Sequence, residues 1–207
     1  NSFGASVALE GDRAVVGGAW VAEGSRYVSG SGHAHLFVRE GGQWSQQARL
    51  DGGPTASDDN FGVAVAMHGG QILVGANFDR VGDTPQGSVM VFGAEGEAWV
   101  PQTQLTAGDG RANDWLGYSV ALDGDTALVG VPLDDIGGEL LGDVVDQGSA
   151  YVFVRSGMTW VEQAKLIAQD GGPDDLFGYQ VALDGDTAVI SAYRDDIEGR
   201  TNQGSAY

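Results

Sequence analysis

Short apolar runs separated by turn residues occupy the whole chain, and the stretch 116–132, LGYSVALDGDTALVGVP, shows the pattern most clearly. Small and apolar side chains alternate over 118–122, and a second apolar run covers 126–130. The residues between them, Asp123-Gly124-Asp125, tolerate the positive φ angles that tight hairpin turns demand. The stretch therefore predicts a β-hairpin whose second strand is buried on both faces.

This pattern is repeated along the chain. Each copy begins with a large apolar residue followed by glycine, which we call the anchor, at 3–4, 61–62, 116–117 and 177–178. A turn follows after seven residues, and a small residue follows after fourteen, at Gly17, Gly75, Gly130 and Ser191. A second glycine then opens a third apolar run, at Gly32, Gly87, Gly148 and Gly204. Twelve residues further on, a tryptophan begins a fourth run, at Trp44, Trp99 and Trp160.

The spacing is constant everywhere except between the second and third runs. We call these variable segments, 18–31, 76–86, 131–147 and 192–203, the elastic loops. The segments that lead from a fourth run to the next anchor, 51–60, 106–115 and 167–176, are the connectors. Constant spacing is expected of packed scaffold, whereas insertions are tolerated at the surface. The elastic loops are therefore predicted to be exposed.

A unit of about 55–60 residues with four short strands is typical of one blade of a β-propeller. We expect an all-β chain with blades at 3–60, 61–115 and 116–176 and a partial fourth at 177–207. About three and a half blades would be a fragment or an incomplete ring. Neighbouring blades, or a second chain, would be needed to close the propeller.

The repeated motifs resemble those of the FG-GAP family, the repeats of integrin α-subunit propellers. The anchor Phe61-Gly62 and the Val74-Gly75-Ala76 that ends the second run carry the resemblance. The Leu-Asp-Gly-Asp turn and the Gln-Gly-Ser-Ala-Tyr-Val-Phe third run are most similar to the bacterial branch. The resemblance implies a propeller of secreted or surface-exposed proteins, often adhesive or ligand-binding and seldom catalytic.

The first turn of each repeat departs from the calcium-binding members of that family. Their loop, D-x-D/N-x-D-G-x-x-D, supplies the several oxygen ligands that Ca²⁺ needs. Here the same turn is shortened to 10–12, 68–70, 123–125 and 184–186. Two carboxylates beside one glycine cannot surround an ion, so the calcium sites of the family are not expected in these turns. The acidic elastic loops remain a possible place for Ca²⁺, and no other cofactor is expected.

Charge narrows the range of partners. The chain has 29 acidic and 10 basic residues, a net charge of −19, and no cysteine. Such a surface repels nucleic acid and anionic membrane but suits cations and cationic partners. No apolar run is long enough to span a bilayer, so we expect no membrane insertion. The chain begins without Met or a signal peptide, as expected of a segment of a longer secreted protein.

Aspartate is concentrated in the elastic loops and connectors, which share one end of a four-stranded blade. The candidate ligand-binding residues in the elastic loops are Asp79, Asp83, Asp134, Asp135, Glu139, Asp143, Asp146, Asp195, Asp196 and Trp20. An exposed acidic loop in an acidic protein is the alternative interpretation. Connector residues Asp59, Asp114 and Asp175 recur just before an anchor, which favours a structural role in a turn.

Three functional hypotheses follow for a chain without a recognisable catalytic motif. The first is a non-catalytic extracellular or cell-envelope binding module that meets a protein or glycan through its acidic loops. The second is a structural spacer. The third is a lectin that uses Trp20 or Trp44, although the fixed position of Trp44, Trp99 and Trp160 favours packing.

Overall fold

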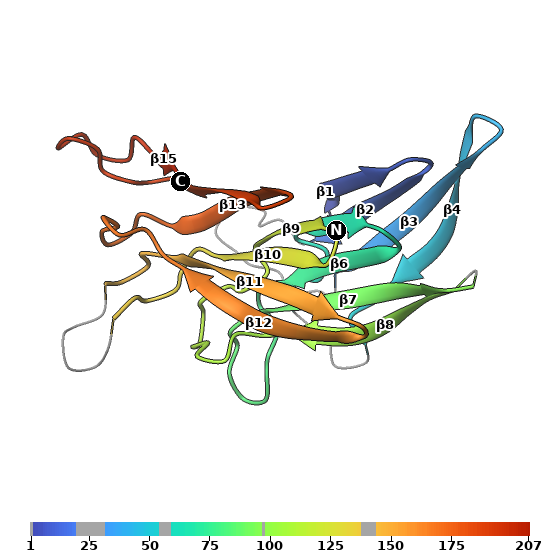
Figure 1. Cartoon of the computed structure of the whole chain (residues 1–207), viewed down its shortest axis with the longest axis horizontal. Helices are drawn as coiled ribbons and strands as arrows, with labels where there is room; N and C mark the ends of the chain where they lie inside the picture. Colours follow the sequence, from blue (N-terminus) through green and yellow to red (C-terminus); the bar gives the residue numbers. More distant parts are fainter. Residues whose placement is uncertain (1, 20–31, 54–58, 97, 138–143) are drawn as a thin grey trace.

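The computed structural model describes residues 2–19, 32–53, 59–96, 98–137 and 144–207. In it the chain folds into four antiparallel sheets (Figure 1). The first sheet contains β1 (Ser2–Glu10), β2 (Arg13–Ala19), β3 (His33–Glu40) and β4 (Gln43–Leu50). The second contains β5 (Val65–His68), β6 (Gln71–Ala76), β7 (Ser88–Glu95) and β8 (Ala98–Leu105). The third contains β9 (Ser119–Asp123), β10 (Thr126–Val131), β11 (Ser149–Ser156) and β12 (Thr159–Leu166). The fourth contains β13 (Phe177–Asp184), β14 (Thr187–Ala192) and β15 (Ser205–Ala206).

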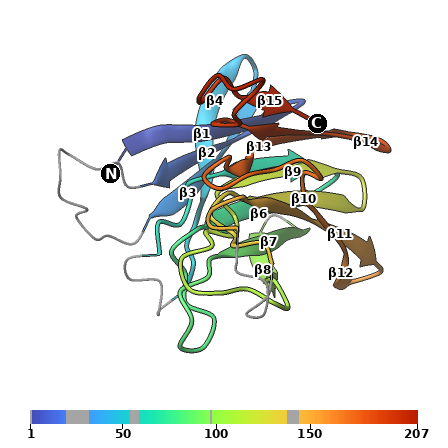
Figure 2. The ribbon, with the colours of Figure 1, turned by 90° about the vertical axis from the view of Figure 1, so that its left-hand side faces the viewer.

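Within each sheet the strands lie side by side in chain order, and the sheets follow one another in the same order (Figures 1 and 2). This is the arrangement of β-propeller blades, so the predicted all-β propeller is confirmed. The described residues contain no helix, and hence none of the length and apolar character needed to cross a bilayer.

The apolar core is divided among the junctions between neighbouring sheets. Phe61 and Val65 of the second sheet pack with Val15 and Leu36 of the first, and similar clusters join the second sheet to the third and the third to the fourth. β5 lies between β1 and β9, and β13 lies against β9 and β10. The inner strands β5 and β9 therefore supply side chains to the junctions on both of their faces, as expected of blades that are stable only when they stack on neighbours.

The anchor glycine explains the constant spacing of fourteen residues. Gly62, Gly117 and Gly178 have φ between 88° and 94°, which bulges the start of the inner strand and turns a carbonyl toward the preceding sheet. That carbonyl lies against the small residue of the preceding blade, where a Cβ at Gly75 would be 2.0 Å from the Gly117 oxygen. Only a residue without a side chain allows this approach.

The second repeated glycine, which opens the third strand, makes a similar contact. The Leu116 N–H donates to the Gln86 carbonyl at 2.8 Å, and the Phe177 N–H donates to Gln147 at 2.8 Å. A Cβ on the following residue, Gly87, would lie 2.3 Å from the Leu116 oxygen. Each anchor is therefore held by two strands of the preceding blade.

The hairpin turns also connect neighbouring blades. Glu10 accepts a hydrogen bond from the Gly69 N–H at 2.8 Å, and Asp123 accepts one from the Gly185 N–H at 2.6 Å. Between the second and third blades the first turn residue is His68, whose Nδ1 lies 3.1 Å from Asp123 Oδ1. The sequence predicted only local bonding in these turns, because the distance between two turns depends on how the blades pack.

Replacing Gly75 with alanine tests the glycine contact. The new Cβ would overlap the Gly117 carbonyl, and we expect the free energy of unfolding to fall by about 2 kcal/mol, as in overpacked cores. Gly108→Ala is the matched control, because its Cβ would have ordinary contact distances, the nearest atom being 3.6 Å away. Urea unfolding of both variants measures the difference. Equal stability of the two would contradict the assigned role of the carbonyl contact.

Candidate functional site

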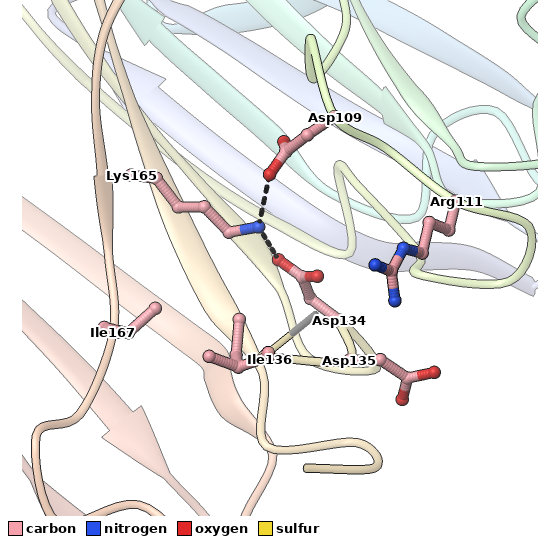
Figure 3. Close-up of a pocket in the computed structure, with 8 residues that line it drawn as sticks. Asp109, Arg111, Asp134, Asp135, Ile136, Lys165 and Ile167 are labelled. Carbon is pink, nitrogen blue, oxygen red and sulfur yellow. Dashed lines mark hydrogen bonds and ion pairs between the residues drawn. The ribbon is translucent and has the colours of Figure 1, made fainter. Parts of the chain in front are cut away.

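A pocket of about 280 Å³ opens between the second and third sheets (Figure 3). The connector that follows β8 contributes Asp109 and Arg111, and the elastic loop that follows β10 contributes residues 134–137. Lys165 comes from the end of β12, and Ile167 lies just beyond it. The pocket thus forms where a connector, an elastic loop and an outer strand meet. The end of β12 and the loop that follows β10 lie at the end of the sheets opposite the hairpin tips (Figure 1).

Lys165, the only lysine of the chain, is the centre of this pocket. Its Nζ lies 2.8 Å from Asp109 Oδ2 and 2.8 Å from Asp134 Oδ2, and 5.2 Å from the centre of the Tyr151 ring. The Tyr151 hydroxyl donates a hydrogen bond of 2.5 Å to the other oxygen of Asp109. One ammonium group therefore joins two carboxylates that come from different blades.

The ionisation of this group follows from its contacts. Burial alone would raise the pKa of Asp109, but hydrogen bonds from Lys165 and Tyr151 outweigh it and hold that pKa below its usual value. Burial alone would lower the pKa of Lys165, and its bonds to Asp109 and Asp134 raise it instead. The pair is therefore charged across the physiological pH range.

Asp134 lines the pocket, but it also occupies a position that recurs in three blades and has the same structural role in each. Its carboxylate accepts a hydrogen bond from Ser149 Oγ at 2.5 Å, and the carboxylate of Asp79 accepts one from Ser88 Oγ. The carbonyls of Asp79, Asp134 and Asp195 each accept a bond of 3.0 Å from the glycine that opens the third strand. These three predicted ligand residues fasten the start of an elastic loop to its own blade.

The remaining predicted residues are more open. Asp135 at the pocket rim accepts a hydrogen bond from the Asp146 N–H at 2.9 Å, and Asp196 accepts one from the Asn202 N–H at 2.7 Å. Burial raises the pKa of Asp146, and the neighbouring carboxylates of Asp135 and Asp174 add to the rise. Asp83 is exposed on the second elastic loop. Glu139, Asp143 and Trp20 lie outside the described residues.

The connector aspartates have the turn geometry that the sequence favoured. Asp114 accepts a hydrogen bond from the Arg111 N–H at 2.5 Å, and Asp175 accepts one from the Gly172 N–H at 2.5 Å. Both side chains are buried, as is Asp59. Burial raises the pKa of Asp114 to about 6, although the bond from Arg111 opposes the rise and Asp134 contributes to it.

The carboxylates of the shortened turns make contacts between neighbouring blades. In the described part of the chain, no group of three or more His, Asp and Glu side chains is placed to hold a metal ion. The Asp123 carboxylate, which lies in one of these turns, accepts a hydrogen bond from the Gly185 N–H and contacts the His68 ring. The shortened turns therefore join neighbouring blades.

The aromatic side chains show one arrangement that sequence reasoning missed. A row of rings crosses the second to fourth sheets with successive centres 4.5–5.9 Å apart, formed by Phe78, Trp115, Tyr118, Tyr179 and Tyr193. Burial raises the pKa of Tyr118, and its hydrogen bond to Tyr179 adds to the rise. A tyrosine directly after the anchor glycine in two consecutive repeats was the available signal. Trp99 and Trp160 pack against the inter-sheet clusters, as predicted, but Trp44 is 46% exposed.

Replacing Lys165 with methionine tests the central ion pair. The buried Asp134 carboxylate and Asp109 would lose their shared cation, and we expect a destabilisation of about 2 kcal/mol. Arg49→Met is the control, since its pair with Asp51 is exposed on both sides and contributes less than about 0.5 kcal/mol. Urea unfolding gives both values. An effect of Lys165→Met as small as the control would show that the pair does not stabilise the junction.

The ionisation of Asp114 makes the folding stability depend on pH, which gives a second test. Unfolded Asp114 loses its proton near pH 3.8 and folded Asp114 near pH 6, so the folded state binds more protons between these values. The parent protein therefore loses stability through this group as the pH rises from 3.8 to 6. Asp114→Asn lacks this titration, and its melting temperature relative to the parent should increase between pH 4 and pH 7. A constant difference over that range would contradict the raised pKa.

Comparisons with known proteins agree with this architecture. No curated protein sequence matches the chain. The crystal structure of Sqt1 from Saccharomyces cerevisiae is similar in fold, with a TM-score of 0.52 over 98% of this chain at 14% sequence identity. The chain spans 47% of the length of that structure.

The sequence itself also matches a family. The FG-GAP repeat model matches residues 44–92, 99–153 and 160–207, so its three copies cover most of the chain. Each matched range contains one anchor, at 61–62, 116–117 and 177–178, with the turn and the start of the third strand that follow it. The chain belongs to the FG-GAP repeat family.

Proposed function

We propose that this FG-GAP propeller segment is a non-catalytic binding module of an extracellular or cell-envelope protein. Its binding surface would be the acidic loop face, which we define as the elastic loops and connectors at one end of the sheets. The pocket around Lys165 is the observation that carries the proposal, because it brings an elastic loop, the segment whose length varies among the repeats, together with a connector of the neighbouring blade.

Rigid attachment of the loops supports a binding role. The Asn113 N–H donates to the Pro85 carbonyl at 2.8 Å, and the Asp174 N–H donates to Val145 at 2.9 Å. Each of these bonds joins a connector to an elastic loop. Loops held in this way lose little conformational entropy on binding, which favours affinity.

The chemistry of the pocket favours a cationic group on the partner. Asp109 and Asp134 are already paired with Lys165, and Asp135 at the rim is the carboxylate of this pocket that is left to meet an incoming cation (Figure 3). Ile136 and Ile167 add apolar surface for the aliphatic part of a lysine or arginine side chain. A basic protein surface therefore fits this site, and the net charge of −19 would speed its approach.

A glycan is the second candidate ligand, and the aromatic row favours it. Tyr193, at the end of the row, is 49% exposed, and tyrosine offers both a ring face and a hydroxyl to a sugar. This site differs in position from the pocket, so the two candidates are separable by substitution.

Neutralising loop carboxylates tests the proposal with fluorescent decalysine as the probe. The variant Asp83→Asn, Asp135→Asn, Asp174→Asn removes three charges from the acidic loop face and retains the acceptor that Asp135 offers to Asp146. At about 0.5 kcal/mol for each exposed pair, we expect the dissociation constant to rise about tenfold. Fluorescence anisotropy measures the change.

The matched control removes the same charge from the opposite end of the sheets. Glu40→Gln, Glu95→Gln and Asp186→Asn lie in exposed hairpin tips and should leave the affinity unchanged. Equal weakening by both triple variants would mean that overall charge binds the peptide, which would overturn the assignment to the loop face. Glycan-array binding lost on Tyr193→Ala, with no decalysine binding, would favour the lectin instead.

A further inference from the structure

Two tyrosines at equivalent positions of consecutive repeats face each other across a junction between blades. Tyr118 and Tyr179 each follow directly after an anchor glycine, whereas the first two repeats have Ala5 and Val63 at this position. Tyr118 immediately precedes β9, and Tyr179 lies in β13, an inner strand that packs against β9. The tyrosine pair therefore belongs to the junction between the third and fourth sheets.

The backbone beside each tyrosine is part of the packed scaffold. The Gly178 carbonyl, next to Tyr179, lies against Gly130 of the preceding blade, where a Cβ would be 2.0 Å from that oxygen. The same carbonyl accepts a hydrogen bond of 2.9 Å from the hydroxyl of Ser119, the residue after Tyr118. The separation of the two tyrosines is thus set by contacts between inner strands and not by the elastic loops.

The two rings meet at their hydroxyl ends. Their centres are 5.1 Å apart, and the hydroxyl groups of Tyr118 and Tyr179 are hydrogen-bonded to each other. Each hydroxyl is attached to a ring carbon that has an ortho carbon on either side. The hydrogen bond therefore brings an ortho carbon of one ring close to an ortho carbon of the other. Oxidised phenols couple through these ortho carbons.

The surroundings of the pair favour this chemistry. Both side chains are partly exposed, so that small oxidised species reach them from solvent. Tyr151 and Tyr207, outside the aromatic row, contact phenylalanine rings, which cannot form phenoxyl radicals. The chain has no cysteine and hence no disulfide to tie its blades together. A pair of phenols offers another route to a covalent tie under oxidising conditions.

We propose that Tyr118 and Tyr179 form a dityrosine cross-link when the chain meets hydrogen peroxide and a haem peroxidase. The peroxidase removes one electron and one proton from each phenol, and the two phenoxyl radicals join through a carbon–carbon bond between ortho positions. The hydrogens on the two joined carbons then move to the oxygens, which restores both aromatic rings. Two tyrosines and one hydrogen peroxide thus give one dityrosine and two waters, and the protein loses two hydrogen atoms.

The fold makes coupling within the chain faster than coupling between chains. Two rings held in contact react as one molecule, with an effective concentration far above that of a second chain in solution. The new bond would close a loop from residue 118 to residue 179 and would join two blades at their inner strands. As with a disulfide, closing a long loop restricts the unfolded chain and stabilises the folded one. The cross-link does not depend on the ligand of the acidic loop face.

Peptide mapping after oxidation with a haem peroxidase and hydrogen peroxide tests the proposal. Trypsin cuts on either side of each tyrosine, after Arg111, Arg155, Lys165 and Arg194. Tyr118 then lies in peptide 112–155, and Tyr179 lies in peptide 166–194. The expected product is these two peptides joined, with their summed mass less two hydrogen atoms and with the fluorescence of dityrosine.

Two variants that each remove one hydroxyl identify the reacting pair. Tyr118→Phe keeps the ring and its packing but cannot form the radical, and the yield of the joined peptides should fall at least about tenfold. Tyr207→Phe is the matched control, because the Tyr207 ring contacts Phe177 and no tyrosine of the aromatic row. Its yield should equal that of the parent.

Each outcome supports or overturns the assignment. An equal yield in Tyr118→Phe and the parent, or a cross-link confined to peptide 166–194, overturns the pairing of Tyr118 with Tyr179. Oxidation that gives cross-links between chains only, or none at all, overturns the proposal. The oxidised parent should also unfold at a higher urea concentration than oxidised Tyr118→Phe, by more than the two chains differ before oxidation. An unchanged difference would show that the bond does not form in the native arrangement of the blades.

Discussion

The close approach of an anchor carbonyl to a glycine of the preceding blade is the contact on which the other features depend. It brings adjacent inner strands near enough for the apolar side chains of both sheets to form one cluster. It also sets the distance between neighbouring hairpin turns, so that a carboxylate in one turn reaches an N–H in the next. Backbone atoms cannot give way as a flexible side chain can, and this explains why the spacing between the two glycines does not vary.

The loops at the other end of the sheets are free of that constraint, and the candidate site lies there. Their starts are fastened by Asp79, Asp134 and Asp195, and their later residues are bonded to the connectors. Length can therefore change in the middle of a loop without disturbing the blades. The pocket around Lys165 uses this freedom, because it joins one elastic loop to the connector of the neighbouring blade.

Much of the fold could be predicted from the sequence, because its four repeats can be aligned with one another. Four copies of the anchor and turn identified the strands, and the variable spacing identified the exposed loops. The turn role of Asp114 and Asp175 was also predictable, since their hydrogen bonds are to residues three positions away. The candidate site was less predictable, because loop aspartates that fasten the fold and those that face solvent have the same composition.

Local and repeated features were thus determined by the sequence itself: the hairpins, the glycine spacing, the position of the elastic loops and the membership of the FG-GAP family. Only the tertiary structure decided which carboxylates share Lys165, that turns of neighbouring blades bond to each other, and that five rings form a continuous row. These contacts join residues from different blades. The distances between these residues depend on the angle and separation of the sheets, and these cannot be inferred from the spacing of residues along the chain.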